Sequence, residues 1–224
     1  AAGSYTNAAG NAGTAGSDTV AVDTAAPVPT LSLDRDITAD DLINASEATQ
    51  PIAITGTVGG DAKAGDTVTL TVNGHDFSGL VAADKTFSIA VPGADLVADG
   101  DRTIDARITT TDDAGNIGTA STSEGYGVDI GIPTVEVVIV DAALNVADPA
   151  SQVTFHFSEA PVGFTAADLS VVGGTVSGLA ATADPTVYTA TFTADAGYTG
   201  PASVTVAAGS YTNAAGNAGT AGSD

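Results

Sequence analysis

Short stretches in which apolar and polar residues alternate recur along the chain, and they constrain the fold more than any other feature. In TVTLTV (67–72) the apolar residues share one face of an extended strand and the threonines share the other. The same alternation marks TFSIAV (86–91), RTIDARI (102–108) and QVTFHF (152–157). Clusters of Gly, Pro, Asp and Asn separate these stretches, as in antiparallel β-sandwiches. We therefore predict an all-β fold.

Local signals agree with this fold class. Asn73-Gly74 lies between two strand-like stretches, and this dipeptide favours the type I′ turn of a β-hairpin. No stretch shows sustained helical periodicity. In QVTFHF, if Phe155 and Phe157 face the core, alternation turns His156 toward water.

The first and last eighteen residues, AAGSYTNAAGNAGTAGSD, are identical. Residue 1 aligns with residue 207, so the period is 206 residues, and we expect the chain to be one period of a tandem array plus an overlap. AVDTAAP (21–27) and GVDIGIP (127–133) stand before two similar sets of strands as short, stiff joints. We predict two tandem Ig-like sandwiches, at 24–131 and 132–224. Residues 1–23 would be the last loop and strand of a preceding copy, and the second sandwich would lack its final strand.

The charge limits the partners. With 27 acidic residues against five Lys and Arg, the net charge is −22, which excludes nucleic acid and anionic membrane surfaces. There is no cysteine for a disulfide and no apolar run long enough to insert into a bilayer. All five Lys and Arg precede residue 108, so the second half holds its carboxylates without protein cations. Either a solvated acidic coat or a divalent cation accounts for this.

Several motifs support a more specific interpretation. DLINASEA, ITGTVGGDAKAGDTVTLTVNG, VPGADLVADGDRTIDA and TTTDDAGNIGTA in the first half, with VTFHFSEAPVGFTAADLSV and SYTNAAGNAG in the second, cover nearly the whole chain. The chain resembles the Ig-like extender repeats of giant RTX-type, biofilm-associated bacterial adhesins. The resemblance implies a structural stalk on the bacterial cell surface, exported by a type I secretion system and stiffened by calcium at domain junctions. It also implies that the adhesive tip of such a protein lies elsewhere.

Sandwich topology predicts where the acidic and amide side chains gather. Loops at one pole of the first sandwich and the facing pole of the second meet at the joint, and calcium prefers such oxygen ligands. For the joint between the sandwiches we predict Asp34, Asp36, Asp40, Asp41, Asn44, Glu47, Asp99, Asp101, Asp129, Glu159, Asp168, Asn213 and Asn217. At the joint with a preceding copy we expect Asp23, Asp61, Asp66, Asp112, Asp113 and Asn116 to gather. Each of these side chains could instead cap a tight turn.

Other functions find less support. Neither His75 nor His156 lies near a G-x-S-x-G motif, and zinc needs more His or Cys than the chain has, so we expect no enzyme. The alternative is an Ig-like module that binds a glycan or a cell-surface partner through its loops. Aromatic residues make up only 5% of the chain, which disfavours a sugar platform. We also expect that residues 14–23 of one molecule can fill the vacant strand position of the next, giving head-to-tail chains.

Overall fold

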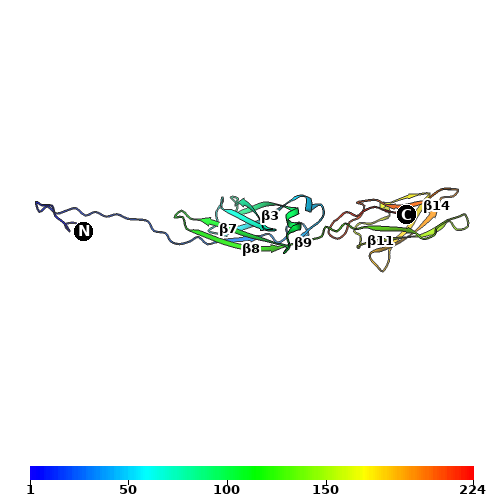
Figure 1. The fold of residues 1–224 in the computed structure, drawn as a ribbon, viewed down its shortest axis with the longest axis horizontal. Coiled ribbons are helices and arrows are strands. Elements are labelled where there is room, and N and C mark those ends of the chain that lie inside the picture. The colour runs from blue at the N-terminus through cyan, green and yellow to red at the C-terminus, as the bar shows by residue number, and fades with distance from the viewer.

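Two β-sandwiches lie end to end, and an extended N-terminal segment projects from one end of the molecule (Figure 1). The computed structural model describes all 224 residues. We call the first sandwich, from β1 to β9, domain 1 and the second, from β10 to β16, domain 2. The expected all-β class and tandem Ig-like arrangement are confirmed.

Domain 1 packs a three-stranded sheet, β1-β3-β6, against a four-stranded sheet, β5-β4-β7-β8. Strands β2 and β9 form a short parallel pair at the end nearest domain 2. The elements of domain 1 are β1 (Pro29–Leu33), β2 (Leu42–Ile43), η1 (Glu47–Thr49), β3 (Pro51–Gly60), β4 (Thr67–Val72), β5 (His75–Leu80), β6 (Thr86–Pro92), α1 (Gly93–Ala98), β7 (Thr103–Thr111), β8 (Ile117–Gly125) and β9 (Gly127–Val128).

Domain 2 packs β10-β11-β14-β13 against β12-β15-β16. Its last strand, β16, is only two residues long, whereas the last long strand of domain 1, β8, has nine. The elements of domain 2 are β10 (Val135–Ile139), β11 (Ala150–Phe157), η2 (Ala166–Asp168), β12 (Leu169–Val172), β13 (Gly174–Ala181), β14 (Val187–Ala194), β15 (Ser203–Val206) and β16 (Gly222–Ser223).

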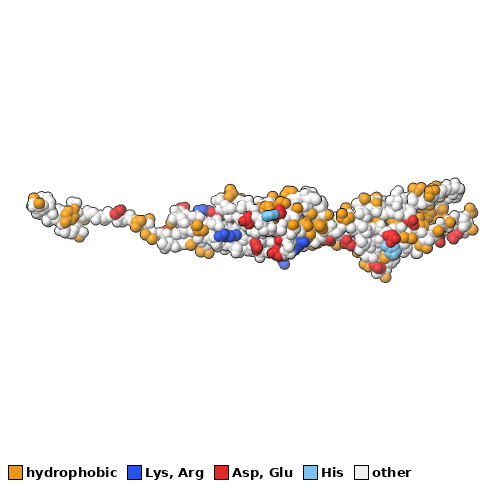
Figure 2. Space-filling view, in the orientation of Figure 1, with side chains coloured by type: hydrophobic (Ala, Val, Ile, Leu, Met, Phe, Trp, Pro, Cys, Tyr) orange, Lys and Arg blue, Asp and Glu red, His pale blue; other side chains and the backbone are white.

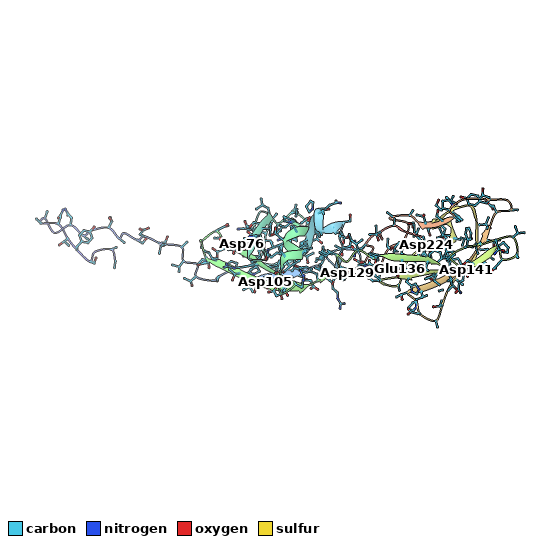
Figure 3. The ribbon with its side chains drawn as sticks, turned by 45° about the vertical axis from the view of Figure 1, so that its right-hand side comes forward. Asp76, Asp105, Asp129, Glu136, Asp141 and Asp224 are labelled. Atoms are coloured by element: carbon cyan, nitrogen blue, oxygen red, sulfur yellow. The ribbon has the colours of Figure 1, made fainter.

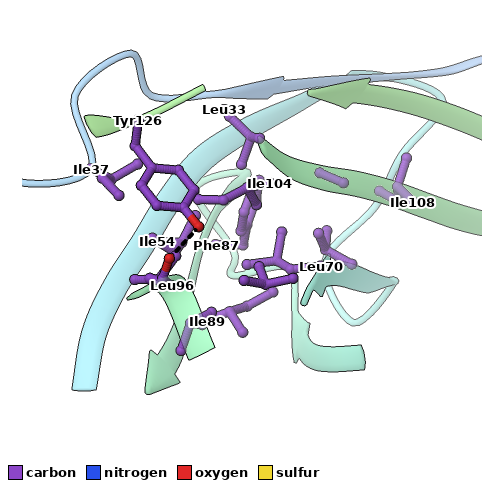
Figure 4. Packing of buried hydrophobic residues seen from close by; sticks show 14 of the residues in the cluster. Leu33, Ile37, Ile54, Leu70, Phe87, Ile89, Leu96, Ile104, Ile108 and Tyr126 are labelled. Carbon is purple, nitrogen blue, oxygen red and sulfur yellow. Dashed lines mark hydrogen bonds between the residues drawn. The ribbon is translucent and has the colours of Figure 1, made fainter. Parts of the chain in front are cut away.

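Alternation along the strands builds each core. In β11, Phe155 and Phe157 are buried and His156 is exposed, as the sequence predicts. Asn73 and Gly74 both have positive φ, 50° and 73°, as a type I′ turn requires. Figure 4 shows the domain 1 core closed by Tyr126, whose hydroxyl donates to the Leu96 carbonyl at 2.8 Å.

Helix α1 is the main departure from the expected all-strand pattern. It is six residues long, and its buried residues are Gly93 and Leu96. A helix of this length completes fewer than two turns, so it leaves no periodic signal in the sequence. No helix in the structure has the length or the apolar character needed to cross a membrane.

Candidate domain-junction site

The linker aspartate Asp129 lies between the two domains, as Figure 3 shows. It directly follows β9, and its backbone N–H donates to the Ile43 carbonyl of β2 at 3.0 Å. Its Oδ1 accepts from the Gly131 N–H at 2.9 Å, a local turn that fixes the direction of the linker. The parallel β2–β9 pair therefore anchors the start of the joint in domain 1.

Asn217 joins the two domains through both ends of its amide. This residue of domain 2 is only 2% exposed. Its Oδ1 accepts from the Ala45 N–H of domain 1 at 2.7 Å, and its Nδ2 donates to the Asp129 carbonyl at 2.8 Å. Each partner is a backbone group, so the contact depends on the position of the two loops and not on the side chains of domain 1.

Asn213 gathers three oxygens around one amide nitrogen. Its Nδ2 is 3.2 Å from Asp129 Oδ2, 3.2 Å from the Gly131 carbonyl and 3.2 Å from Glu159 Oε2. An amide NH₂ has only two hydrogens, so three acceptors compete for them. The Asn213 Oδ1 is already used, because it accepts from the N–H groups of Ala215 and Asn217 at 3.1 and 2.9 Å.

No Lys or Arg forms an ion pair with the carboxylates of the joint. The only ion pair in the structure is His75 with Asp95, at 2.9 Å, and it lies on domain 1. Lys and Arg atoms appear over domain 1 but not on the visible face of domain 2 (Figure 2). Asp129 and Glu159 are both half-buried, which strengthens their mutual repulsion. Nowhere in the molecule do three or more His, Asp or Glu side chains gather as metal ligands.

A loop at the N-terminal end of domain 1 makes the same hydrogen bonds to the preceding linker that the Asn213–Asn217 loop makes at the joint. Asn116 Nδ2 donates to the Asp23 carbonyl at 3.2 Å, as Asn217 does to Asp129. Asp112 Oδ1 accepts from the N–H groups of Ala114 and Asn116, as Asn213 Oδ1 does from the corresponding residues. The hydrogen bond from the Asn116 side chain lowers the pKa of Asp112. The loops TDDAGN and TNAAGN therefore dock on a linker aspartate in the same way.

Asn44 and Glu47 lie at the joint but cap the first turn of η1. Asn44 Oδ1 accepts from the Ser46 and Glu47 N–H groups, and Glu47 Oε2 accepts from the Asn44 N–H at 3.0 Å. They shape the loop that presents the Ala45 N–H to domain 2. The turn-capping alternative therefore describes the contacts that these two side chains make.

The other predicted residues bind within their own domains. Asp99 is buried, and its Oδ2 lies 2.9 Å from the Tyr126 hydroxyl, whose one hydrogen it shares with the Leu96 carbonyl. Burial, and next the hydrogen bond to Asp99, raises the pKa of Tyr126. Asp168 accepts from the Thr165 N–H at 2.6 Å in a capping box. Each of the remaining predicted residues either accepts a hydrogen bond from a residue of its own domain or is exposed and accepts none. Asp34 accepts from Thr55, Asp40 from Thr38 and Leu42, Asp41 from Ile37, and Asp101 from Thr103, while Asp36 and Asp113 are exposed.

Two groups of the joint region lie outside the predicted set. The Gly131 carbonyl and the Ala45 N–H are backbone groups, and no residue type marks them in a sequence. Of the residues expected at the N-terminal joint, Asp61 accepts from the Val28 N–H at 2.8 Å, and Asp66 is buried and accepts from the Lys63 N–H at 2.7 Å.

The two sandwiches and their matching joints make the chain a tandem Ig-like protein. Residues 129–224 match the model of the bacterial Ig-like domain. The chain is 43% identical to a bacterial immunoglobulin-like domain from the M. primoryensis ice-binding adhesin, over 46% of this chain and 98% of that one, with a TM-score of 0.41. The chain therefore belongs to the bacterial Ig-like domain family.

Two longer solved structures cover almost the whole chain. One is from a 1.5-MDa bacterial ice-binding adhesin, at 28% identity and a TM-score of 0.63, over 98% of this chain and 70% of that one. The other is from a Ca²⁺-stabilized adhesin of an Antarctic bacterium that binds ice, at 29% identity and a TM-score of 0.67. The chain covers 54% of that structure. No curated protein matches the chain.

Proposed function

We propose that this chain is an extender module of a bacterial surface adhesin, whose two sandwiches are held in line by calcium at their joint. The end-to-end arrangement of the domains supports a spacer role (Figure 1). The similar structures come from large adhesins, and one of them is Ca²⁺-stabilized. In this role the module holds a distal ligand-binding tip away from the cell, for attachment and biofilm formation.

The observation that carries the proposal is the oxygen cluster around Asn213. Asp129, Glu159 and the Gly131 carbonyl supply more acceptors than the Asn213 amide has hydrogens. These are hard oxygen donors of the kind that calcium takes in flexible, six- to eight-coordinate sites. Bound there, calcium would supply the positive charge that no Lys or Arg ion pair gives these carboxylates.

The two carboxylates of the proposed calcium site come from different domains. Asp129 brings a ligand from the end of domain 1, and Glu159 brings one from the end of β11 in domain 2. Because the ligands come from both domains, bending the joint would separate them. Asn217 keeps its hydrogen bonds to the backbone of domain 1 and is not needed as a ligand.

Calcium titration calorimetry of the whole chain tests this proposal. We expect Glu159→Gln to weaken binding at the joint at least tenfold, because it removes one of only two carboxylates in the cluster. Glu136→Gln is the matched control, since Glu136 is exposed on β10 of the same domain and changes the net charge equally. Equal affinities of the two variants, or the absence of binding at millimolar calcium, would refute the calcium clamp.

A further inference from the structure

Gly131, in the linker between the domains, lies beside both carboxylates of the joint. A Cβ added to this glycine would stand 3.2 Å from Asp129 Oδ1 and 3.7 Å from Glu159 Oε1. Outside its two chain neighbours it would meet no other atom within 4 Å, and Gly131 is exposed to solvent. The missing side chain therefore leaves an open space that is bordered by one oxygen of each carboxylate.

Each of the two carboxylates has one oxygen near Asn213 and the other near Gly131. Asp129 Oδ2 and Glu159 Oε2 lie 3.2 Å from Asn213 Nδ2, so the amide hydrogens serve this pair. On the Gly131 side, Asp129 Oδ1 accepts only from the Gly131 N–H at 2.9 Å, and Glu159 Oε1 accepts from no protein donor. Since a carboxylate offers about four lone-pair sites, the Gly131 side keeps free acceptor capacity.

The backbone conformation does not require a glycine at position 131. Gly131 does not have the positive φ that favours glycine over other residues. The linker before domain 1 has Ala25 at the equivalent position, and the Ala25 N–H donates to Asp23 Oδ1 at 3.0 Å, as the Gly131 N–H does to Asp129 Oδ1. The linker turn therefore accommodates a Cβ, and the absence of one at Gly131 changes only the space beside the carboxylates.

We propose that Gly131 determines which divalent cations the joint admits, an inference that rests on the calcium clamp proposed above. Asp129 Oδ1 and Glu159 Oε1 would hold the cation, while Asn213 keeps its contacts with the other two carboxylate oxygens. Calcium completes its six to eight oxygen ligands with water, and the exposed space at Gly131 leaves room for that water.

Because the space is limited, the affinity of the joint depends on the radius of the cation. The methyl group of Gly131→Ala would stand 3.2 Å from Asp129 Oδ1, which is closer than an ordinary contact, so it would narrow the space. Strontium and barium carry the same charge as calcium but have larger radii, and barium is the largest. A narrower space should therefore weaken barium binding most and calcium binding least, whereas the loss of a carboxylate charge should weaken all three alike.

Titration calorimetry of the whole chain with calcium, strontium and barium tests the role of Gly131. We expect Gly131→Ala to weaken calcium binding at the joint at least tenfold, and strontium and barium binding progressively more. Gly100→Ala is the matched control, because Gly100 is exposed, lacks a positive φ, and an added Cβ there meets no atom within 4 Å. This control should bind all three ions as the unmodified chain does. In chelator, Gly131→Ala should keep the melting temperature of the unmodified chain, since Ala25 occupies the equivalent turn.

Glu159→Gln separates the failure of this inference from the failure of the calcium clamp. It removes a charge and should weaken binding of the three ions by similar factors. If Glu159→Gln weakens binding and Gly131→Ala does not, the clamp stands and the role of Gly131 is overturned. Equal losses of the three ions in Gly131→Ala would also overturn selection by size. The absence of binding in the unmodified chain would refute the clamp and, with it, the role of Gly131.

Discussion

Asn217→Ala should uncouple the two domains without unfolding either of them. The substitution removes two hydrogen bonds, from the Ala45 N–H at 2.7 Å and to the Asp129 carbonyl at 2.8 Å. Each bond contributes about 1 kcal/mol net, and the half-buried partners left unpaired add to the cost. A loss of about 2–3 kcal/mol at the joint corresponds to a roughly 30- to 150-fold shift from docked toward undocked domains.

Pulsed dipolar spectroscopy measures this shift directly. Because the chain has no cysteine, Ser121→Cys on β8 and Gln152→Cys on β11 give one spin label on each domain, both at exposed positions. We expect Asn217→Ala to broaden the distance distribution between the labels in calcium-free buffer. Circular dichroism should show unchanged strand content, because neither hydrophobic core includes Asn217.

Asn116→Ala is the matched control. Asn116 occupies the same position in the equivalent loop of domain 1, but its side chain donates to Asp23 and Asp112 on the N-terminal side. The distance distribution of this variant should remain as narrow as that of the unmodified chain. If Asn217→Ala leaves the distribution unchanged, or if both variants broaden it equally, the Asn217 bridge does not hold the joint.

Three further predictions concern the separate domains. Phe192→Ala empties a fully buried site and should lower the free energy of unfolding of domain 2 by about 3–5 kcal/mol, seen in calorimetry with the domain 1 transition unchanged. Gly219→Ala places a Cβ 2.1 Å from the Tyr211 ring and should also lower the melting temperature, while Gly13→Ala in the exposed N-terminal copy should not. The raised pKa of Tyr126 means that its contribution to stability is complete below pH 10 and falls as pH rises further. Tyr126→Phe should remove the fall in the free energy of unfolding of domain 1 above pH 10, measured by urea unfolding at several pH values, while the buried Tyr211 keeps the corresponding fall in domain 2. An unchanged pH dependence of the domain 1 transition would contradict the assignment.

The strands and cores of this protein could be predicted because apolar and polar residues alternate along the strands, and this alternation is visible in the sequence. TVTLTV and QVTFHF alternate strictly, and Asn73-Gly74 sets the hairpin between β4 and β5. Helix α1 could not be predicted, since six residues give too little periodicity. Its place depends on packing, where Leu96 enters the domain 1 core.

The joint could be predicted only in part. Pole-by-pole topology brings Asp129, Glu159, Asn213 and Asn217 together, and the structure connects them by hydrogen bonds. The same reasoning cannot distinguish a carboxylate that binds a metal ion from one that accepts a hydrogen bond inside a domain. Asp99 is an example, because its carboxylate accepts from the buried Tyr126 hydroxyl. Which oxygen each amide and carboxylate meets depends on loop paths that residue types do not encode.

The most direct test of the account is the width of the distance distribution between the two labelled domains in calcium and in chelator. We predict that calcium narrows the distribution for the Ser121→Cys, Gln152→Cys chain, that magnesium at the same concentration does so much less, and that Glu159→Gln abolishes the response. A distribution that is equally wide in calcium and in chelator would contradict the claim that a cation clamps the two sandwiches into a rod.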